Sequence, residues 1–257
     1  MDIHIDSVCH IAVQAGGSIL NIYAKTFDVE FKEDQSPLTE ADRVSHRIIS
    51  EELRKLYPDI PVLSEEGKDI PFSEREMWDR FWLVDPLDGT KEFIKRNGEF
   101  TVNIALIENN SPVIGVIYVP VQNLLYYAVK NQGAWKKHGS AEPVRIHVSH
   151  GPDGDGLIVV QSRSHPSEEL QRYLERLNIK ESIARGSSLK LCAVAEGSAD
   201  IYPRLGPTWE WDTAAGHAIV EAAGGHVVDL KKVPLGYNKK IIKHEHFIAV
   251  SDFSLMP

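Results

Sequence analysis

The two halves of this chain carry different patterns of apolar residues, and that contrast restricts the fold more than any other feature. Between residues 101 and 129, three apolar runs of strand length are separated by turns rich in Asn, Ser and Pro, which is typical of a β-meander. After a Gly- and Asp-rich stretch at 151–156, strand-like and helix-like segments alternate instead. The sequence therefore predicts an α+β first domain, residues 1–150, and an α/β second domain, residues 151–257.

Two amphipathic helices are expected before the meander. Apolar residues recur at helical spacing through residues 3–25, and again from Val44 to Leu56. For the second helix, Thr39 is the expected N-cap, and Asp42 completes a capping box three residues later. Short strands are expected at 61–63 and 81–84, at 101–108, 113–119 and 124–129, and in the second half at 157–161, 201–202, 226–230 and 247–250. Helices are expected there at 167–177, 187–196 and 211–223.

Composition restricts the class of protein. With 42% hydrophobic and 25% charged residues among 257, the chain matches an ordinary globular protein with a full core. The formal net charge of −9 argues against binding a nucleic acid polymer, because such binding depends on Lys and Arg. Cys9 and Cys192 have no metal-binding spacing and are expected to be buried. We expect no transmembrane segment and no signal sequence, hence a cytoplasmic protein.

Acidic side chains follow or begin several apolar segments. Glu65-Glu66 ends one strand-like run, and the sequence DPLDGT at 85–90 ends another; Asp212 begins a helix. Carboxylate oxygens are the ligands that Mg²⁺ prefers, so each position is a candidate metal ligand. Each also has a local explanation, as a turn residue, as an acid at a helix N-terminus or, for Asp42, as part of a capping box. The set as a whole is harder to explain in this way.

In their order along the chain, these motifs resemble those of the lithium-sensitive, Mg²⁺-dependent phosphatase superfamily that includes the inositol monophosphatases. The motifs are EE at 65–66, DPLDGT at 85–90 and WDTAAG at 211–216. Within that superfamily, residues 36–42, 88–101 and 186–190 resemble the 3'(2'),5'-bisphosphate nucleotidases. The resemblance covers essentially the whole chain. It implies an α+β fold, the five-layered αβαβα sandwich of the inositol monophosphatase and fructose bisphosphatase type.

The resemblance also implies a site for two Mg²⁺ ions, with a third, weaker one. Glu65, Asp85 and the Leu87 carbonyl would ligate the first ion, and Asp85, Asp88 and Asp212 the second. Thr90 and Asp42 would form a catalytic relay beside Glu65. The four carboxylates of this site would repel an anionic substrate, so metal must accompany it. The implied substrate-binding residues are Glu65, Leu87, Asp88, Gly89, Thr90, Ser187, Ser188, Lys190 and Asp212.

A second anionic group of the substrate is expected near Ser187, Ser188 and Lys190, which precede or begin an apolar helix. A plain serine N-cap with a surface lysine explains the same residues equally well. The cluster His244-Glu245-His246 has residue types that bind metals but lacks a third ligand, so we expect a strand at a solvated sheet edge.

The implied reaction removes the 3'-phosphate of adenosine 3',5'-bisphosphate, giving AMP and phosphate, with 3'-phosphoadenylyl sulfate as a second substrate, in sulfate assimilation. The resemblance also implies a peripheral position on the cytoplasmic side of the inner membrane. An inositol monophosphatase would share every metal ligand, and residues 91–101 and 186–190 favour the nucleotidase over it. A metal-dependent binding protein without catalysis is the alternative from another class, but it would not need the relay of Thr90 and Asp42.

Overall fold

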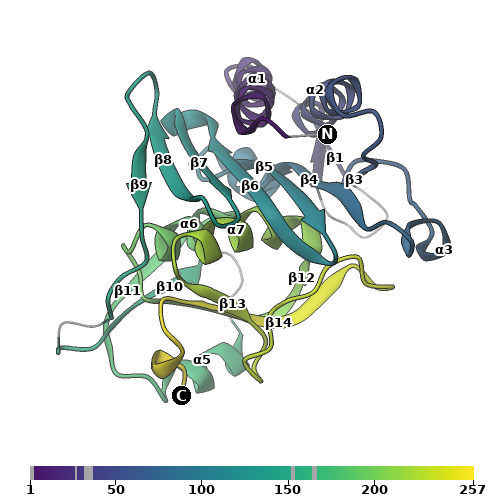
Figure 1. Cartoon of the computed structure of the whole chain (residues 1–257). Coiled ribbons are helices and arrows are strands. Elements are labelled where there is room, and N and C mark those ends of the chain that lie inside the picture. The colour runs from purple at the N-terminus through teal and green to yellow at the C-terminus, as the bar shows by residue number, and fades with distance from the viewer. Residues whose placement is uncertain (1–2, 27, 32–36, 152–153, 164–166) are drawn as a thin grey trace.

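The computed structural model describes residues 3–26, 28–31, 37–151, 154–163 and 167–257 and arranges them in five layers (Figure 1). Two helices cover a seven-stranded sheet, two more separate it from a five-stranded sheet, and one lies beyond the second sheet. In layer order these helices are α1 (Ile5–Tyr23) and α2 (Glu40–Leu56), then α6 (Leu189–Ala195) and α7 (Glu210–Ala222), and last α5 (Glu168–Leu174). The predicted αβαβα sandwich is confirmed. Ser36 of the stretch 36–42, Met1 and Asp2 of the N-terminus, and Pro152 and Asp153 of the expected boundary lie outside the described residues.

The larger sheet has the strand order β3-β4-β5-β6-β7-β8-β9, with β3 and β4 parallel and all other neighbours antiparallel. The expected meander is confirmed in β5, β6 and β7. Sequence reasoning missed β8 and β9, because β8 becomes polar along its length and β9 has one buried residue. The strands are β3 (Val62–Ser64), β4 (Arg80–Asp88), β5 (Thr101–Glu108), β6 (Ser111–Val119), β7 (Leu124–Val129), β8 (Gly133–His138) and β9 (Val144–Ile146).

The smaller sheet has the order β11-β10-β12-β14-β13, in which β10 is parallel to both β11 and β12 while β14 is antiparallel to its neighbours. The predicted alternation of strands and helices is confirmed. Only β11 was missed, because this edge strand buries none of its residues and so lacks an apolar pattern. The strands are β10 (Leu157–Ser162), β11 (Ile179–Arg185), β12 (Ile201–Trp209), β13 (His226–Val228) and β14 (Lys243–Val250).

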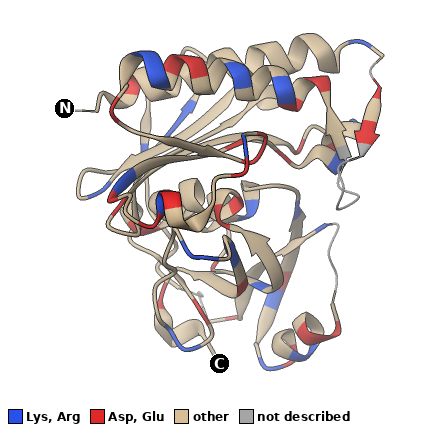
Figure 2. Cartoon of the chain, turned by 90° about the vertical axis from the view of Figure 1, so that its right-hand side faces the viewer, with Lys and Arg blue, Asp and Glu red and all other residues tan. Residues whose placement is uncertain are grey.

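Helix α2 forms as its sequence predicts. Thr39 is the N-cap, its hydroxyl accepts from Ala41 N, and the Asp42 carboxylate accepts from Thr39 N at 2.8 Å. Apolar residues such as Ile49 and Leu53 are buried against the sheet. Acidic and basic residues alternate in blocks along the helix (Figure 2), so its solvent face carries mixed charge. The helix also brings Asp42 to the underside that faces the sheet, where it is buried.

The middle layer joins both halves of the chain in one core. Helix α7 buries residues on all sides, as expected for a helix enclosed between two sheets. Its close approach to β6 requires a glycine, since a Cβ on Gly115 would lie 2.2 Å from the Ala215 carbonyl oxygen. The same buried cluster contains Leu83 from the larger sheet and Val160 from the smaller one. The position of α7 is therefore fixed from both sides.

The prediction of a solvated edge at His244-Glu245-His246 is wrong. These residues do form part of strand β14 and pair with β12, but His244 is buried, with its ring 5.3 Å from that of Tyr237, and of the three only Glu245 is exposed. Burial lowers the pKa of His244 to about 3, so the ring is neutral, and its Nδ1 accepts a hydrogen bond from Lys239 Nζ at 2.6 Å.

The remaining elements are short. Both cysteines are buried, as expected. None of the helices built from described residues combines the length and apolarity that a bilayer crossing requires. The short elements are β1 (Val29–Phe31) and β2 (Pro37–Thr39), α3 (Phe72–Arg75) and α4 (Thr90–Ile94), and the 3₁₀ turns η1 (Pro120–Gln122) and η2 (Phe253–Leu255).

Candidate active site between the two sheets

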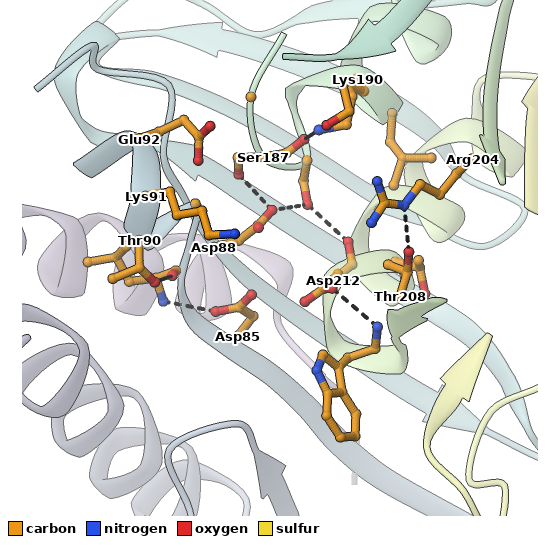
Figure 3. Close-up of a pocket in the computed structure, with 18 of the residues that line it drawn as sticks. Asp85, Asp88, Thr90, Lys91, Glu92, Ser187, Lys190, Arg204, Thr208 and Asp212 are labelled. Atoms are coloured by element: carbon orange, nitrogen blue, oxygen red, sulfur yellow. Dashed lines mark hydrogen bonds between the residues drawn. The ribbon is translucent and has the colours of Figure 1, made fainter. Parts of the chain in front are cut away.

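A pocket of about 250 Å³ contains every residue that the sequence predicted to contact metal or substrate (Figure 3). Its walls come from both halves of the chain: β4 and α4 on one side, and α6, β12 and the start of α7 on the other. Asp42, which the sequence predicted as the relay partner of Thr90, is not among the lining residues but accepts a hydrogen bond from Thr90 Oγ1. The predicted residues in the wall are Glu65, Asp85, Leu87, Asp88, Gly89, Thr90, Ser187, Ser188, Lys190 and Asp212.

Parallel pairing of β3 and β4 brings the first two carboxylates together. Ser64 pairs with Val84, and Glu65 N, one residue beyond β3, donates to Val84 O at 3.1 Å. Side chains at equivalent positions of neighbouring parallel strands lie on the same face of the sheet. Glu65 and Asp85 are therefore adjacent because of strand register.

A β-bulge in β4 lets both Asp85 and Asp88 line the same pocket. In a regular strand, residues three apart point to opposite faces. Here Asp85 pairs with Asn103 and Asp88 with Thr101, so β4 has one more residue than β5 in this interval. Such a bulge turns the following side chains toward the other face. Strand β4 runs on to Asp88, beyond the end that we predicted at residue 84, and both acids belong to it.

The fourth carboxylate comes from the second half of the chain. Asp212 lies in the first turn of α7, and its Oδ2 accepts from Trp209 N at 3.2 Å. One carboxylate oxygen from each of Glu65, Asp85 and Asp212 lies within 4.8 Å of the other two. An all-oxygen group of this size fits a hard divalent cation such as Mg²⁺. The structure thus brings together three of the residues that the sequence predicted as metal ligands.

Burial and mutual repulsion make this cluster costly to ionise without a cation. Burial raises the pKa of Asp85 well above its usual value, and the nearby charges of Glu65, Asp88 and Asp212 raise it further. The pKa of Asp212 is raised in the same way, by burial first and then by Asp88 and Glu65. A bound cation removes both causes, because it replaces water as the partner of the charges and offsets their repulsion.

Asp88 lies in the same pocket but outside the group of three. Its Oδ2 accepts hydrogen bonds from the hydroxyls of Ser187, at 2.6 Å, and Ser188, at 2.8 Å. Asn103 Nδ2 lies 3.4 Å from the same oxygen. Ser188 is the N-cap residue of α6, in keeping with the alternative interpretation of a serine N-cap, but its side chain makes no cap bond and its hydroxyl donates to Asp88. The two serines thus connect α6 to β4.

The two oxygens of Asp42 have different partners. Oδ2 accepts from both the amide and the hydroxyl of Thr39, and Oδ1 accepts from Thr90 Oγ1 at 3.4 Å. Burial raises the pKa of Asp42 to about 6, although the bonds from Thr39 oppose this shift. The capping and catalytic interpretations of Asp42 are therefore compatible.

Lys190 is more enclosed than a surface lysine. The residue is buried, its Nζ donates to the Ser187 carbonyl, and it lies 5.5 Å from the centre of the Tyr202 ring. Burial lowers the pKa of Lys190, and the carboxylates of Asp88, Glu92 and Asp212 oppose this shift. The alternative of a routine surface lysine is wrong, because α6 packs in the middle layer with all seven residues buried.

Arg204 is the main pocket residue that sequence reasoning missed. Its Nε donates to Thr208 Oγ1 at 2.9 Å and its Nη2 to Pro207 O at 3.3 Å, which leaves the rest of the guanidinium directed into the pocket (Figure 3). Tyr202 lines the pocket two residues earlier on the same face of β12. We predicted this strand only over residues 201–202. A predicted strand that extended to residue 204 would have placed Tyr202 and Arg204 on the same face. The other unpredicted lining residues are Lys91, Glu92, Ser162, Gly186, Leu191, Thr208, Trp209, Thr213 and Phe247.

Comparison with known proteins identifies the class of protein to which this fold and this acidic site belong. The chain belongs to the inositol monophosphatase family, whose sequence profile matches residues 4–251. Within this family it is 51% identical over 240 residues, 92% of this chain and 94% of the relative, to the 3'(2'),5'-bisphosphate nucleotidase CysQ of Escherichia coli K12. It is 37% identical to the protein of the same name from Haemophilus influenzae, over 97% of this chain and 93% of that one.

Solved structures agree. The crystal structure of CysQ from Bacteroides thetaiotaomicron, a bacterial member of the inositol monophosphatase family, matches with a TM-score of 0.84 and 46% identity, over 96% of each chain. The Thermotoga maritima IMPase matches with a TM-score of 0.80 and 27% identity, over 96% of this chain and 91% of that one.

Proposed function

We propose that this chain is a Mg²⁺-dependent 3'(2'),5'-bisphosphate nucleotidase that removes the 3'-phosphate of adenosine 3',5'-bisphosphate to give AMP and phosphate. The observation that carries the proposal is the meeting of Glu65, Asp85 and Asp212 in one pocket of a chain about half identical to the CysQ nucleotidases. We further propose 3'-phosphoadenylyl sulfate as a second substrate and sulfate assimilation as the setting.

The residues of the pocket fit the metal that the family uses. Glu65, Asp85 and the Leu87 carbonyl would hold one Mg²⁺, and Asp85, Asp88 and Asp212 a second, so that Asp85 is shared. When bound, the ions supply electrostatic stabilisation of the phosphoryl oxygens and orientation of the attacking water. The Leu87 carbonyl oxygen lies 3.5 Å from Thr90 Oγ1, and both residues line the pocket.

Thr90 and Asp42 are positioned to take the proton of the attacking water. Thr90 Oγ1 lines the pocket and donates to Asp42 Oδ1, so a proton accepted by the hydroxyl can be matched by transfer of the hydroxyl proton to the carboxylate. Thr39 holds the other oxygen of Asp42 with two hydrogen bonds, which fixes the orientation of the carboxylate. In this scheme the buried Asp42 carboxylate receives a proton from Thr90, and the proton of the water stays on the Thr90 hydroxyl.

The far end of the pocket suits a second phosphate. Arg204 offers a guanidinium held in place by Thr208 and Pro207 O, and arginine binds phosphate oxygens through a planar pair of donors. Lys190 lines the same pocket and adds positive charge. Together with the backbone around Ser187 and Ser188, these groups can hold the 5'-phosphate while the carboxylate end acts on the 3'-phosphate. An inositol monophosphate lacks this second group.

Phosphate release from a panel of substrates tests the proposal. We expect adenosine 3',5'-bisphosphate to be hydrolysed with a much higher kcat/KM than inositol 1-phosphate or fructose 1,6-bisphosphate. A preference for inositol 1-phosphate would make the chain an inositol monophosphatase and leave the metal site in place. Tight Mg²⁺ binding without phosphate release from any of the three would instead support the non-catalytic alternative.

A further inference from the structure

Glu210 is a buried charged residue that the reaction does not use. It is the first residue of α7, two positions before Asp212, and is fully buried. Its two carboxylate oxygens accept from the backbone amides of Asn238, at 2.7 Å, and Lys239, at 3.1 Å. Lys239 Nζ lies 3.4 Å from one of them. The start of α7 is therefore bound to the loop that precedes β14.

The same loop is bound on its other side by Arg75 at the end of α3. Arg75 Nη1 donates to Asn238 Oδ1 at 2.8 Å, and Asn238 Nδ2 donates back to the Arg75 carbonyl at 2.7 Å. Arg75 Nη2 donates to Lys240 O at 3.2 Å, and its Nε to Ile70 O at 3.4 Å. Arg75 is buried, as is Asn238. One guanidinium thus joins residue 70 to the loop at 238–240.

These contacts form a chain between the two halves of the metal site. Arg75 and Ile70 belong to the segment that follows Glu65, and Glu210 precedes Asp212 on α7. Glu65 and Asp212 must stay within ligand distance, although one follows β3 of the larger sheet and the other comes from the middle layer. We propose that Arg75, Asn238 and Glu210 are positioning residues that hold Asp212 against Glu65 and thereby set the affinity of the site for Mg²⁺. This inference depends on the metal site of the proposed function.

The physical reason is the mutual repulsion of the carboxylates. Without a cation, Glu65, Asp85 and Asp212 repel one another, and a flexible connection would let Asp212 move away. Hydrogen bonds to buried charged groups are strong, and leaving either partner unpaired is costly. When the ligands are already held in the geometry that the metal requires, binding does not have to order them first. Groups that orient metal ligands therefore affect metal affinity.

Two substitutions break the series of contacts from Arg75 through Asn238 to Glu210 at different points. Glu210→Gln keeps the shape but replaces one acceptor oxygen by an NH₂ group facing a backbone N–H. Asn238→Gly removes both side-chain bonds between Asn238 and Arg75 without any change in charge and leaves only the bond from Arg75 Nη2 to Lys240 O. Glycine tolerates the left-handed backbone of this residue, φ 64°. Lys239→Met is the matched control, because it removes the ammonium next to Glu210 but leaves both backbone amides in place.

Mg²⁺ binding is measured without substrate, by calorimetry and by the rise in melting temperature with Mg²⁺ concentration. We expect Glu210→Gln and Asn238→Gly each to raise the Mg²⁺ Kd by about tenfold or more, with kcat recovering at saturating Mg²⁺, and Lys239→Met to bind like the parent. A lower melting temperature in both variants with an unchanged Kd would overturn the inference, because it would make the contacts merely structural. If Glu210→Gln does not fold, Asn238→Gly decides. Absence of Mg²⁺ binding by the parent protein would refute the metal site itself.

Discussion

Thr90 Oγ1 donates to Asp42 Oδ1 at 3.4 Å, joining the first residue of α4 to a buried carboxylate on α2 that is 48 residues distant in sequence. The bond passes from the pocket wall to the space between α2 and the larger sheet. Because the other oxygen of Asp42 is occupied by Thr39, rotation of the carboxylate away from Thr90 would break two further bonds. Local capping of a helix thus fixes the orientation of the carboxylate that we propose as part of the catalytic relay.

This relationship predicts that Thr90 and Asp42 act as one unit. Thr90→Ala should lower kcat by about 10²–10⁴, the range for a positioned acid–base group, with a much smaller change in KM. Asp42→Asn should have a similar effect, and the double variant should lose little more than either single one. Steady-state kinetics at saturating Mg²⁺ measure all three. Losses that add would show that the two residues contribute separately.

The pKa shifts predict how pH affects the metal-free protein. The folded state raises the pKa of Asp85, Asp212 and Asp42 above the value near 4 of an unfolded aspartate. It therefore binds more protons than the unfolded state above that pH, and its stability falls as pH rises through the folded pKa values. The measurement is the melting temperature in EDTA between pH 5 and pH 8. It should fall less steeply with rising pH for Asp85→Asn than for the parent protein, and Asp85→Asn should be the more stable of the two at pH 8. Equal slopes would show that Asp85 ionises freely without metal.

Metal removal should abolish turnover. Excess EDTA is expected to stop phosphate release, and added Mg²⁺ to restore it, because the carboxylate cluster repels an anionic substrate when it lacks cations. The family resemblance further predicts inhibition by millimolar Li⁺. The assay is phosphate release from adenosine 3',5'-bisphosphate in chelated buffer with stepwise return of each ion. Full turnover in EDTA would exclude the metal site.

Arg204 and Lys190 should differ in which substrates they affect. Arg204→Ala should lower kcat/KM for adenosine 3',5'-bisphosphate by about ten- to a hundredfold, the loss of one charge-assisted contact, and leave adenosine 3'-monophosphate almost unaffected. Lys190→Ala should reduce both, because Lys190 Nζ also holds the Ser187 carbonyl beside Asp88. Parallel kinetics on the two nucleotides compare them. Equal losses with both substrates in Arg204→Ala would show that Arg204 does not contact the 5'-phosphate.

The sequence alone determined the features that depend on neighbouring residues. The apolar periodicity of α1, α2 and the meander, the capping box of Thr39 and Asp42, and the metal-ligand motifs all lie within short stretches, so their patterns are readable in one dimension. Where a strand lacks an apolar pattern, as in the exposed edge strand β11, the same reasoning failed. It also failed at His244, which we expected at a solvated edge because its cluster lacks a third metal ligand, but which is buried.

Only the tertiary structure decided how these stretches meet. Strand register places Glu65 beside Asp85, a bulge turns Asp88 toward the same pocket, and the packing of α7 between two sheets brings Asp212 within ligand distance of residues more than 120 positions earlier in the chain. The enclosure of Lys190, the direction of Arg204 and the Arg75–Asn238–Glu210 chain follow from the same packing. Such contacts depend on burial and on long-range pairing, which are set by the whole core and leave no local pattern in the sequence.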